Sequence, residues 1–189
     1  PGEVYLFEGV AHDFAPRSDP GRTAPLVLRV MSPADLRLRE GDPLAPAFEK
    51  LRACAESQQR SHSAVSQLRL HLDEATVAGT VTRHLDSAKR PQRKALGLAG
   101  EALSLLRATQ EGQSFAADLK PLAEGEMPWV LRDLDAMRND PALAPDKLDP
   151  TLDRQAYILR ELLRLLGRMT ERSAEDLAGD APDAGWNEH

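Results

Sequence analysis

The stretch DPTLDRQAYILRELLRLLGRMT, residues 149–170, decides the fold class of this chain. Its apolar residues recur every three or four positions, which is the spacing that places them on one face of an α-helix. Asp149 is a good N-terminal cap and Pro150 a good first residue, so we expect a helix over 150–178. Arginines lie opposite the apolar face, which predicts a core or interface helix. The residues predicted to make its contacts are Leu159, Leu163, Leu166 and Met169.

Proline placement indicates where further helices can run, because a proline inside a helix removes a hydrogen bond and clashes with the preceding turn, at about 3 kcal/mol. The proline-free windows 47–90 and 92–120 each carry an apolar stripe. We expect helix from 46 to about 88 and a second helix that begins at Pro91, with a turn between them. The polar stretch ESQQRSHS, residues 56–63, is either a break between two helices or a solvated length of one long helix. The sequence leaves this choice open.

The composition suits a helical bundle and excludes several classes of protein. Of the 189 residues, 41% are apolar but only 4% are aromatic, which favours helix-on-helix packing of Leu, Ala and Val. A single cysteine, Cys54, excludes an intramolecular disulfide framework and a multi-cysteine zinc site. The sequence has no apolar run of about 18 residues and no secretory signal. We therefore expect no membrane insertion, and a location in the cytoplasm or within a particle assembled inside the cell.

Residues 1–45 differ from the rest, because they are rich in proline and contain two short runs of β-branched and aromatic residues. We predict an N-terminal arm of two strands and a short helix, then a helical bundle domain over 46–178 and a flexible acidic tail over 179–189. The fold class is thus mainly α: an antiparallel bundle or hairpin of long amphipathic helices with a two-stranded arm. Two strands alone are marginal in water, so they should pair within the chain or with a neighbour. The predicted strand residues are Val4, Tyr5, Leu6, Phe7, Leu26, Val27, Leu28 and Val30.

Charge is unevenly distributed along the chain, whose formal net charge is −6. Residues 46–111 hold 10 basic and 7 acidic side chains, whereas residues 112–189 hold 9 basic and 16 acidic ones. Such halves can attract one another between copies as well as within one chain. Basic residues also gather at the expected turn between the first two helices, where they can contact an acidic protein surface or phosphates. This basic cluster consists of Arg83, Lys89, Arg90, Arg93 and Lys94.

No catalytic constellation is visible in the sequence. The five histidines form no metal-binding pair at helical spacing. Cys54 falls on an apolar face, where we expect an inert buried thiol. The segment GLAGEAL at 97–103 lacks both the preceding strand and the spacing of a phosphate loop. We therefore expect a protein that is not an enzyme and that uses no cofactor or metal.

The sequence favours a structural or adaptor protein. It would act by self-association, as a homo-oligomer, or by docking into a larger assembly such as a multi-subunit or viral particle. The alternative is a nucleic-acid-associated helical protein that uses the basic cluster across 83–94, although no interleaved aromatic residues support base stacking. The partner, the subunit number and the pairing of the N-terminal strands stay open.

Overall fold

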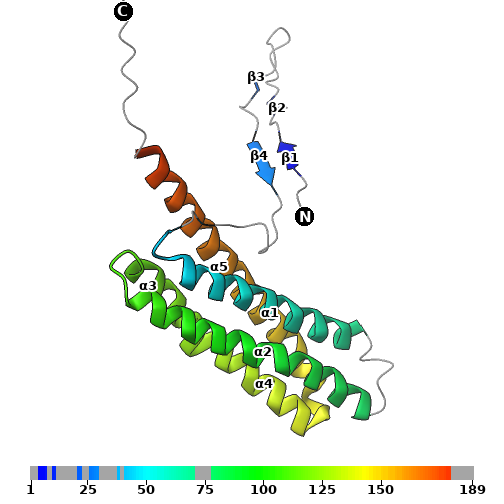
Figure 1. Cartoon of the computed structure of the whole chain (residues 1–189). Helices are drawn as coiled ribbons and strands as arrows, with labels where there is room; N and C mark the ends of the chain where they lie inside the picture. The colour runs from blue at the N-terminus through cyan, green and yellow to red at the C-terminus, as the bar shows by residue number, and fades with distance from the viewer. Residues whose placement is uncertain are drawn as a thin grey trace, which may run out of the picture. The chain divides into compact units, whose positions relative to one another are not determined.

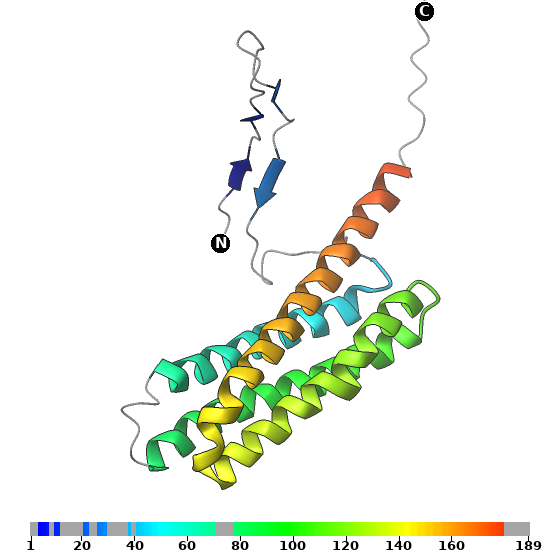
Figure 2. The ribbon, with the colours of Figure 1, turned by 180° about the vertical axis from the view of Figure 1, so that it is seen from behind.

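The computed structural model describes residues 4–7, 10–11, 21–22, 26–29, 38, 41–70 and 78–179. The chain divides into two units, Pro1–Leu36 and Arg37–His189, and each is described by itself. The second unit consists of packed helices (Figure 1; seen from behind in Figure 2), so the predicted helical bundle is confirmed. These helices are α1 (Ala45–Leu70), α2 (Ala78–Arg107), α3 (Gln113–Pro121), α4 (Met127–Asn139) and α5 (Ala144–Gly179).

Neighbouring helices run antiparallel, because residues early in one helix meet residues late in the next. Between α1 and α2, the Cys54 thiol donates to the Ala95 carbonyl over 3.3 Å and the Ser61 hydroxyl donates to the Ala88 carbonyl over 2.9 Å. Both α2 and α5 pack against α1 and against α4, so α2 and α5 lie at diagonally opposite corners of the bundle. Ion pairs that show the same antiparallel register are Arg69–Asp149 between α1 and α5, Asp42–Arg172 between the segment just before α1 and helix α5, Asp86–Arg138 between α2 and α4, and Asp133–Lys147 between α4 and α5.

The core lies along the axis of the bundle, where each helix turns its apolar face inward. Leucine, alanine and methionine side chains dominate it, as the low aromatic content predicts. Burial of one large aliphatic side chain contributes about 1.5–3 kcal/mol, so these faces hold the helices together. Core residues that are at most 1% exposed include Leu51, Leu68, Leu85, Leu106, Leu134, Ile158, Leu162 and Leu166.

The expected turn near Pro91 is wrong, because α2 continues through this proline. Pro91 has no N–H to donate to the carbonyl one turn earlier, which is why a helix start was predicted. Packing against α1 overrides that preference: Ala88, Gln92 and Ala95, on both sides of Pro91, are all fully buried. The residues between 46 and 88 therefore belong to two helices that are separated at 71–77, a segment outside the described residues.

Of the two alternatives for residues 56–63, the break is wrong, because the stretch is continuous helix within α1. The helix is solvated only in part: Gln59, Arg60 and Ser63 are exposed, whereas Ser57, Gln58 and Ser61 are buried. The polar groups of Gln58 and Ser61 are tolerated because they bond to Gln92, to Gln155 and to the Ala88 carbonyl across the bundle.

The C-terminal half contains two further differences from the expectation. Helix α3 joins α4 through a π-helical turn, Leu122–Glu126, in which the N–H of Met127 donates to the Leu122 carbonyl five residues back. Prolines flank this turn, and the wider turn accommodates their missing N–H groups. Helix α5 begins at Ala144 rather than at Pro150, because Asp140 caps the preceding 3-10 turn by accepting from the N–H of Ala142 over 3.1 Å.

The described residues of the N-terminal unit form four short strands. In it β1 (Val4–Phe7) pairs antiparallel with β4 (Leu26–Arg29), and β2 (Val10–Ala11) pairs with β3 (Gly21–Arg22). Most residues between and after these strands lie outside the described residues, including Val30, the expected short helix and the tail after 179. The predicted N-terminal arm as a unit therefore stays a prediction.

Candidate functional site

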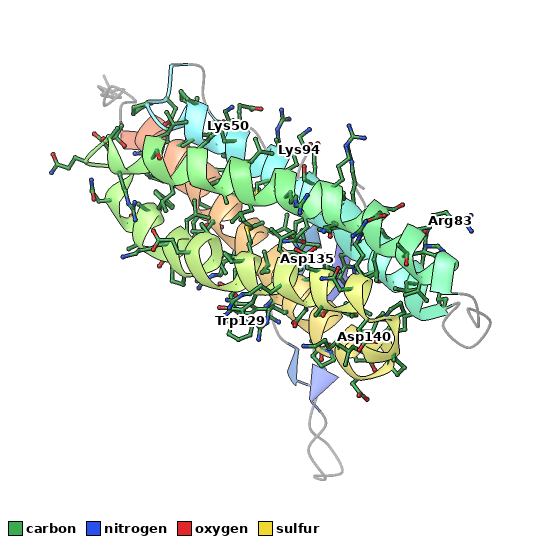
Figure 3. The ribbon with its side chains drawn as sticks, turned by 90° about the horizontal axis from the view of Figure 1, so that it is seen from below. Lys50, Arg83, Lys94, Trp129, Asp135 and Asp140 are labelled. Carbon is green, nitrogen blue, oxygen red and sulfur yellow. The ribbon has the colours of Figure 1, made fainter. Side chains whose placement is uncertain are left out.

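The basic cluster lies on the outward face of α2, opposite the buried residues of that helix. Arg83, Arg90, Arg93 and Lys94 are exposed, whereas Lys89 is only 13% exposed and pairs with Asp135 of α4. Figure 3 shows Arg83 and Lys94 along one edge of the bundle. The sequence thus predicted the cluster, but the structure separates one structural lysine from four solvent-facing cations.

Ion pairing distinguishes these four residues from most other cations of the bundle. Elsewhere in the described part, most lysines and arginines pair with carboxylates, often between helices, as in the pair of Lys50 with Glu101. Arg83, Arg90, Arg93 and Lys94 pair with no carboxylate in the same part of the chain. We call these four residues the α2 face. Arg90, Arg93 and Lys94 lie within about one helical turn of one another, and Asp86, the carboxylate beside them, pairs with Arg138. These cations repel one another, so an anionic partner would relieve that repulsion.

A surface hollow of about 330 Å³ lies where the α2 face meets α4. Arg138 of α4 reaches it, held by Asp86 of α2 through an Nε–Oδ1 contact of 2.6 Å. The hollow therefore has fixed cations on its walls and the unpaired Arg90 and Arg93 at its rim, which is suitable for holding a carboxylate or phosphate group. Its lining residues are Asp86, Lys89, Arg90, Arg93 and Arg138.

A layer of buried amides crosses the core at the level of Pro91, and sequence reasoning missed it. Gln92 donates from Nε2 to Oε1 of Gln58 over 3.0 Å, and Gln155 donates from Nε2 to Oε1 of Gln92 over 3.1 Å and to the Ser61 hydroxyl over 2.8 Å. All four side chains are fully buried. Nε2 of Gln58 and Oε1 of Gln155 have no hydrogen-bond partner. We call Gln58, Gln92 and Gln155 the glutamine layer. Neutral amides supply no nucleophile or proton donor of useful pKa, so the layer is structural.

The four contact residues predicted on α5 do not form one free surface. Leu166 and Met169 are fully buried within the bundle of a single chain. Leu159 and Leu163 are half-buried, so they keep only part of their surface for another molecule. These contacts within one chain do not test whether α5 forms an interface with another molecule.

Trp129 is the largest exposed aromatic side chain among the described residues, at 48% exposed. The guanidinium groups of Arg132 and Arg154 lie 4.1 Å and 5.3 Å from its ring centroid, so the ring already makes cation–π contacts within the chain. Figure 3 shows Trp129 on the edge opposite Arg83 and Lys94. The ring therefore belongs to a different surface from the α2 face.

The titratable groups with shifted pKa values lie in the interior or against it. Cys54 is fully buried, as predicted, and burial raises the pKa of its thiol to about 12. Burial also lowers the pKa of His62. Among the described residues, no group of three or more His, Cys, Asp or Glu side chains can hold a metal ion.

Hydropathy and comparison add two findings. Within the part of the chain that the structure describes, no helix is both long and apolar enough to span a bilayer. Comparison of the chain with protein-family models, curated proteins and solved structures found no match.

Proposed function

We propose that this protein is a non-enzymatic structural or adaptor protein that docks an acidic partner surface on the α2 face. The observation that carries the proposal is the clustering of unpaired cations at Arg83, Arg90, Arg93 and Lys94, in a bundle whose other cations mostly form ion pairs. Such a face raises the local concentration of an anionic partner and speeds its encounter. The predicted N-terminal arm would supply a second contact by strand pairing.

The partner is better described as an acidic protein than as nucleic acid. The α2 face covers 12 residues from Arg83 to Lys94, whose 11 steps of 1.5 Å give about 16 Å. Its described surroundings offer no exposed aromatic ring for base stacking. Nucleic-acid binding is the alternative outcome of the same experiment.

The test is a titration of the full chain with poly-L-glutamate and, separately, with duplex DNA. The variant Arg90→Glu/Arg93→Glu reverses two charges of the α2 face. The matched control Lys120→Glu/Arg164→Glu reverses two exposed cations that pair with carboxylates of their neighbourhood, and changes the net charge equally. Binding is followed by fluorescence anisotropy of the labelled polyanion.

We expect poly-L-glutamate to bind the natural chain and the control, to bind the α2-face variant at least tenfold more weakly, and to dissociate as salt rises. Preference for duplex DNA, with a steep salt dependence, would favour the alternative. Equal binding by all three proteins, or no binding at low salt, would remove the proposed function.

A further inference from the structure

The α2 face has a counterpart of opposite charge on the other side of the same bundle. Asp146 and Asp153 are exposed on the outward face of α5, and Asp140 lies in the turn before it. Like the α2 face, these three carboxylates pair with no cation among the described residues. We call them the α5 face. Figure 3 shows Asp140 on the edge opposite Arg83 and Lys94.

The two faces point in opposite directions. Helices α2 and α5 lie at diagonal corners of the bundle, and the contact between Gln92 and Gln155 runs between them through the core. Arg90 lies on the side of α2 away from buried Leu85, Ala88 and Ala95, because these residues are rotated by nearly half a circle around the helix axis from Arg90. The same relation holds on α5 between Asp153 and buried Gln155 and Ile158. A single bundle therefore cannot bring its own two faces together.

The faces also lie at the same height along the bundle. Lys89 of α2 pairs with Asp135 of α4, while Asp133, half a turn away, pairs with Lys147 of α5. These pairs put Arg90 level with Asp146, whereas the direct hydrogen bond between Gln92 and Gln155 puts it level with Asp153, so Arg90 lies between the two carboxylates. Because α2 and α5 are both antiparallel to α4, they are parallel to each other, and positions further along one match positions further along the other. Arg83 then lies between the levels of Asp140 and Asp146, and Lys94 lies near the level of Asp153.

We infer that the acidic partner of the α2 face is the α5 face of a second copy of this chain. This inference rests on the proposed function and names its partner. A sideways shift of one copy, without rotation, places its cations against the carboxylates of the next copy at matching heights. Such an interface joins two different surfaces and leaves one of each free, so it extends into an open row of copies rather than closing as a dimer.

The surfaces beside the charges suit close approach. Gly97, one turn beyond Arg93 and Lys94 on α2, is exposed and has open space in front of its backbone. Tyr157, one turn beyond Asp153 on α5, is an exposed aromatic residue of the kind enriched at interfaces. Exposed ion pairs are individually weak and are screened by salt, so we expect association at low ionic strength and high protein concentration.

The test is sedimentation velocity of the full chain with two complementary variants. Arg90→Glu/Arg93→Glu/Lys94→Glu makes the α2 face acidic, and Asp146→Lys/Asp153→Lys makes the α5 face basic. All five positions are exposed, and circular dichroism checks that both variants fold. In about 10 mM salt, where charges act over about 30 Å, the natural chain should sediment faster as its concentration rises, and about 1 M salt should abolish this.

Each variant alone should stay monomeric, because both of its faces then carry the same sign. An equimolar mixture should recover association, because opposite faces meet again at every junction. Association of either variant alone as strong as that of the natural chain, or no recovery in the mixture, overturns the inference. A natural chain that binds poly-L-glutamate through the α2 face yet stays monomeric also overturns it, while leaving the proposed function standing.

Discussion

Replacing Gln92 by methionine tests how the glutamine layer contributes to stability. Methionine matches glutamine in length and in helix propensity, so the change mainly removes polar atoms. Gln92 donates one hydrogen bond to Gln58 and accepts one from Gln155. Without it, Oε1 of Gln58 joins Nε2 of the same residue as a buried group that lacks a partner, while Gln155 keeps its bond to Ser61. An orphaned buried acceptor costs about 1–3 kcal/mol and the loss of the second hydrogen bond about 1 kcal/mol. We therefore expect the free energy of unfolding to fall by about 2–4 kcal/mol.

The triple variant that places methionine at Gln58, Gln92 and Gln155 should behave differently. It removes every amide of the layer, including the two atoms that have no partner in the natural protein, and the Ser61 hydroxyl keeps its bond to the Ala88 carbonyl. Replacing all partners of a buried polar group together is often neutral or stabilising. The triple variant should therefore be at least as stable as the natural chain.

Urea unfolding followed by far-UV circular dichroism measures the free energies of unfolding of the natural chain, of Gln92→Met and of the triple variant. Gln59→Met is the matched control, because Gln59 is exposed beside Gln58 and its replacement should change the free energy by less than about 0.5 kcal/mol. A triple variant destabilised at least as much as Gln92→Met would refute the reasoning, since the amides would then act as favourable contacts rather than as a partly unsatisfied network.

Three further predictions concern single residues. Asp42→Ala should lower the unfolding free energy by about 3 kcal/mol in urea melts. The reason is that this carboxylate, 4% exposed, accepts from the Leu44 N–H over 2.8 Å and pairs with Arg172. Asp42→Asn keeps an acceptor, so it should lower the unfolding free energy less. Cys54 should resist a disulfide reagent at about pH 8 until the chain unfolds, because burial raises its thiol pKa to about 12; rapid labelling of the native chain would contradict this. Burial lowers the pKa of His62, so its neutral form is favoured in the folded state, and the unfolding free energy should decline as pH falls below 6.5. His62→Gln should flatten that decline when unfolding is measured at several pH values. An unchanged pH dependence in this variant would disprove the prediction.

The sequence predicted those features that depend on spacing along one helix. The apolar repeat of α5 follows from local periodicity. The continuous course of α2 did not follow, because the local preference of Pro91 is overridden by α1, which contacts the helix on both sides of it.

The glutamine layer shows a second limit of sequence reasoning. Gln58 reads as a polar, solvated position because its partners Gln92 and Gln155 are far away in the chain. A buried polar group is recognisable only when those partners are known. The cations of the α2 face illustrate the reverse case. Their positions are clear from the sequence, but whether each has a carboxylate partner depends on α4, so Lys89 and Arg90 could not be distinguished.

Carbodiimide cross-linking tests the central claim, that the α2 face docks on acidic residues of another copy, most directly. The reagent joins an amine to a carboxylate only when they touch, and a mixture of isotopically light and heavy chains identifies products between copies. The ion pair of Lys50 with Glu101, 2.5 Å apart within one chain, is the internal control. The account predicts mixed-isotope products that join Lys94 to Asp146 or Asp153 at low salt. Formation of the Lys50–Glu101 product without any intermolecular product of Lys94 would contradict it.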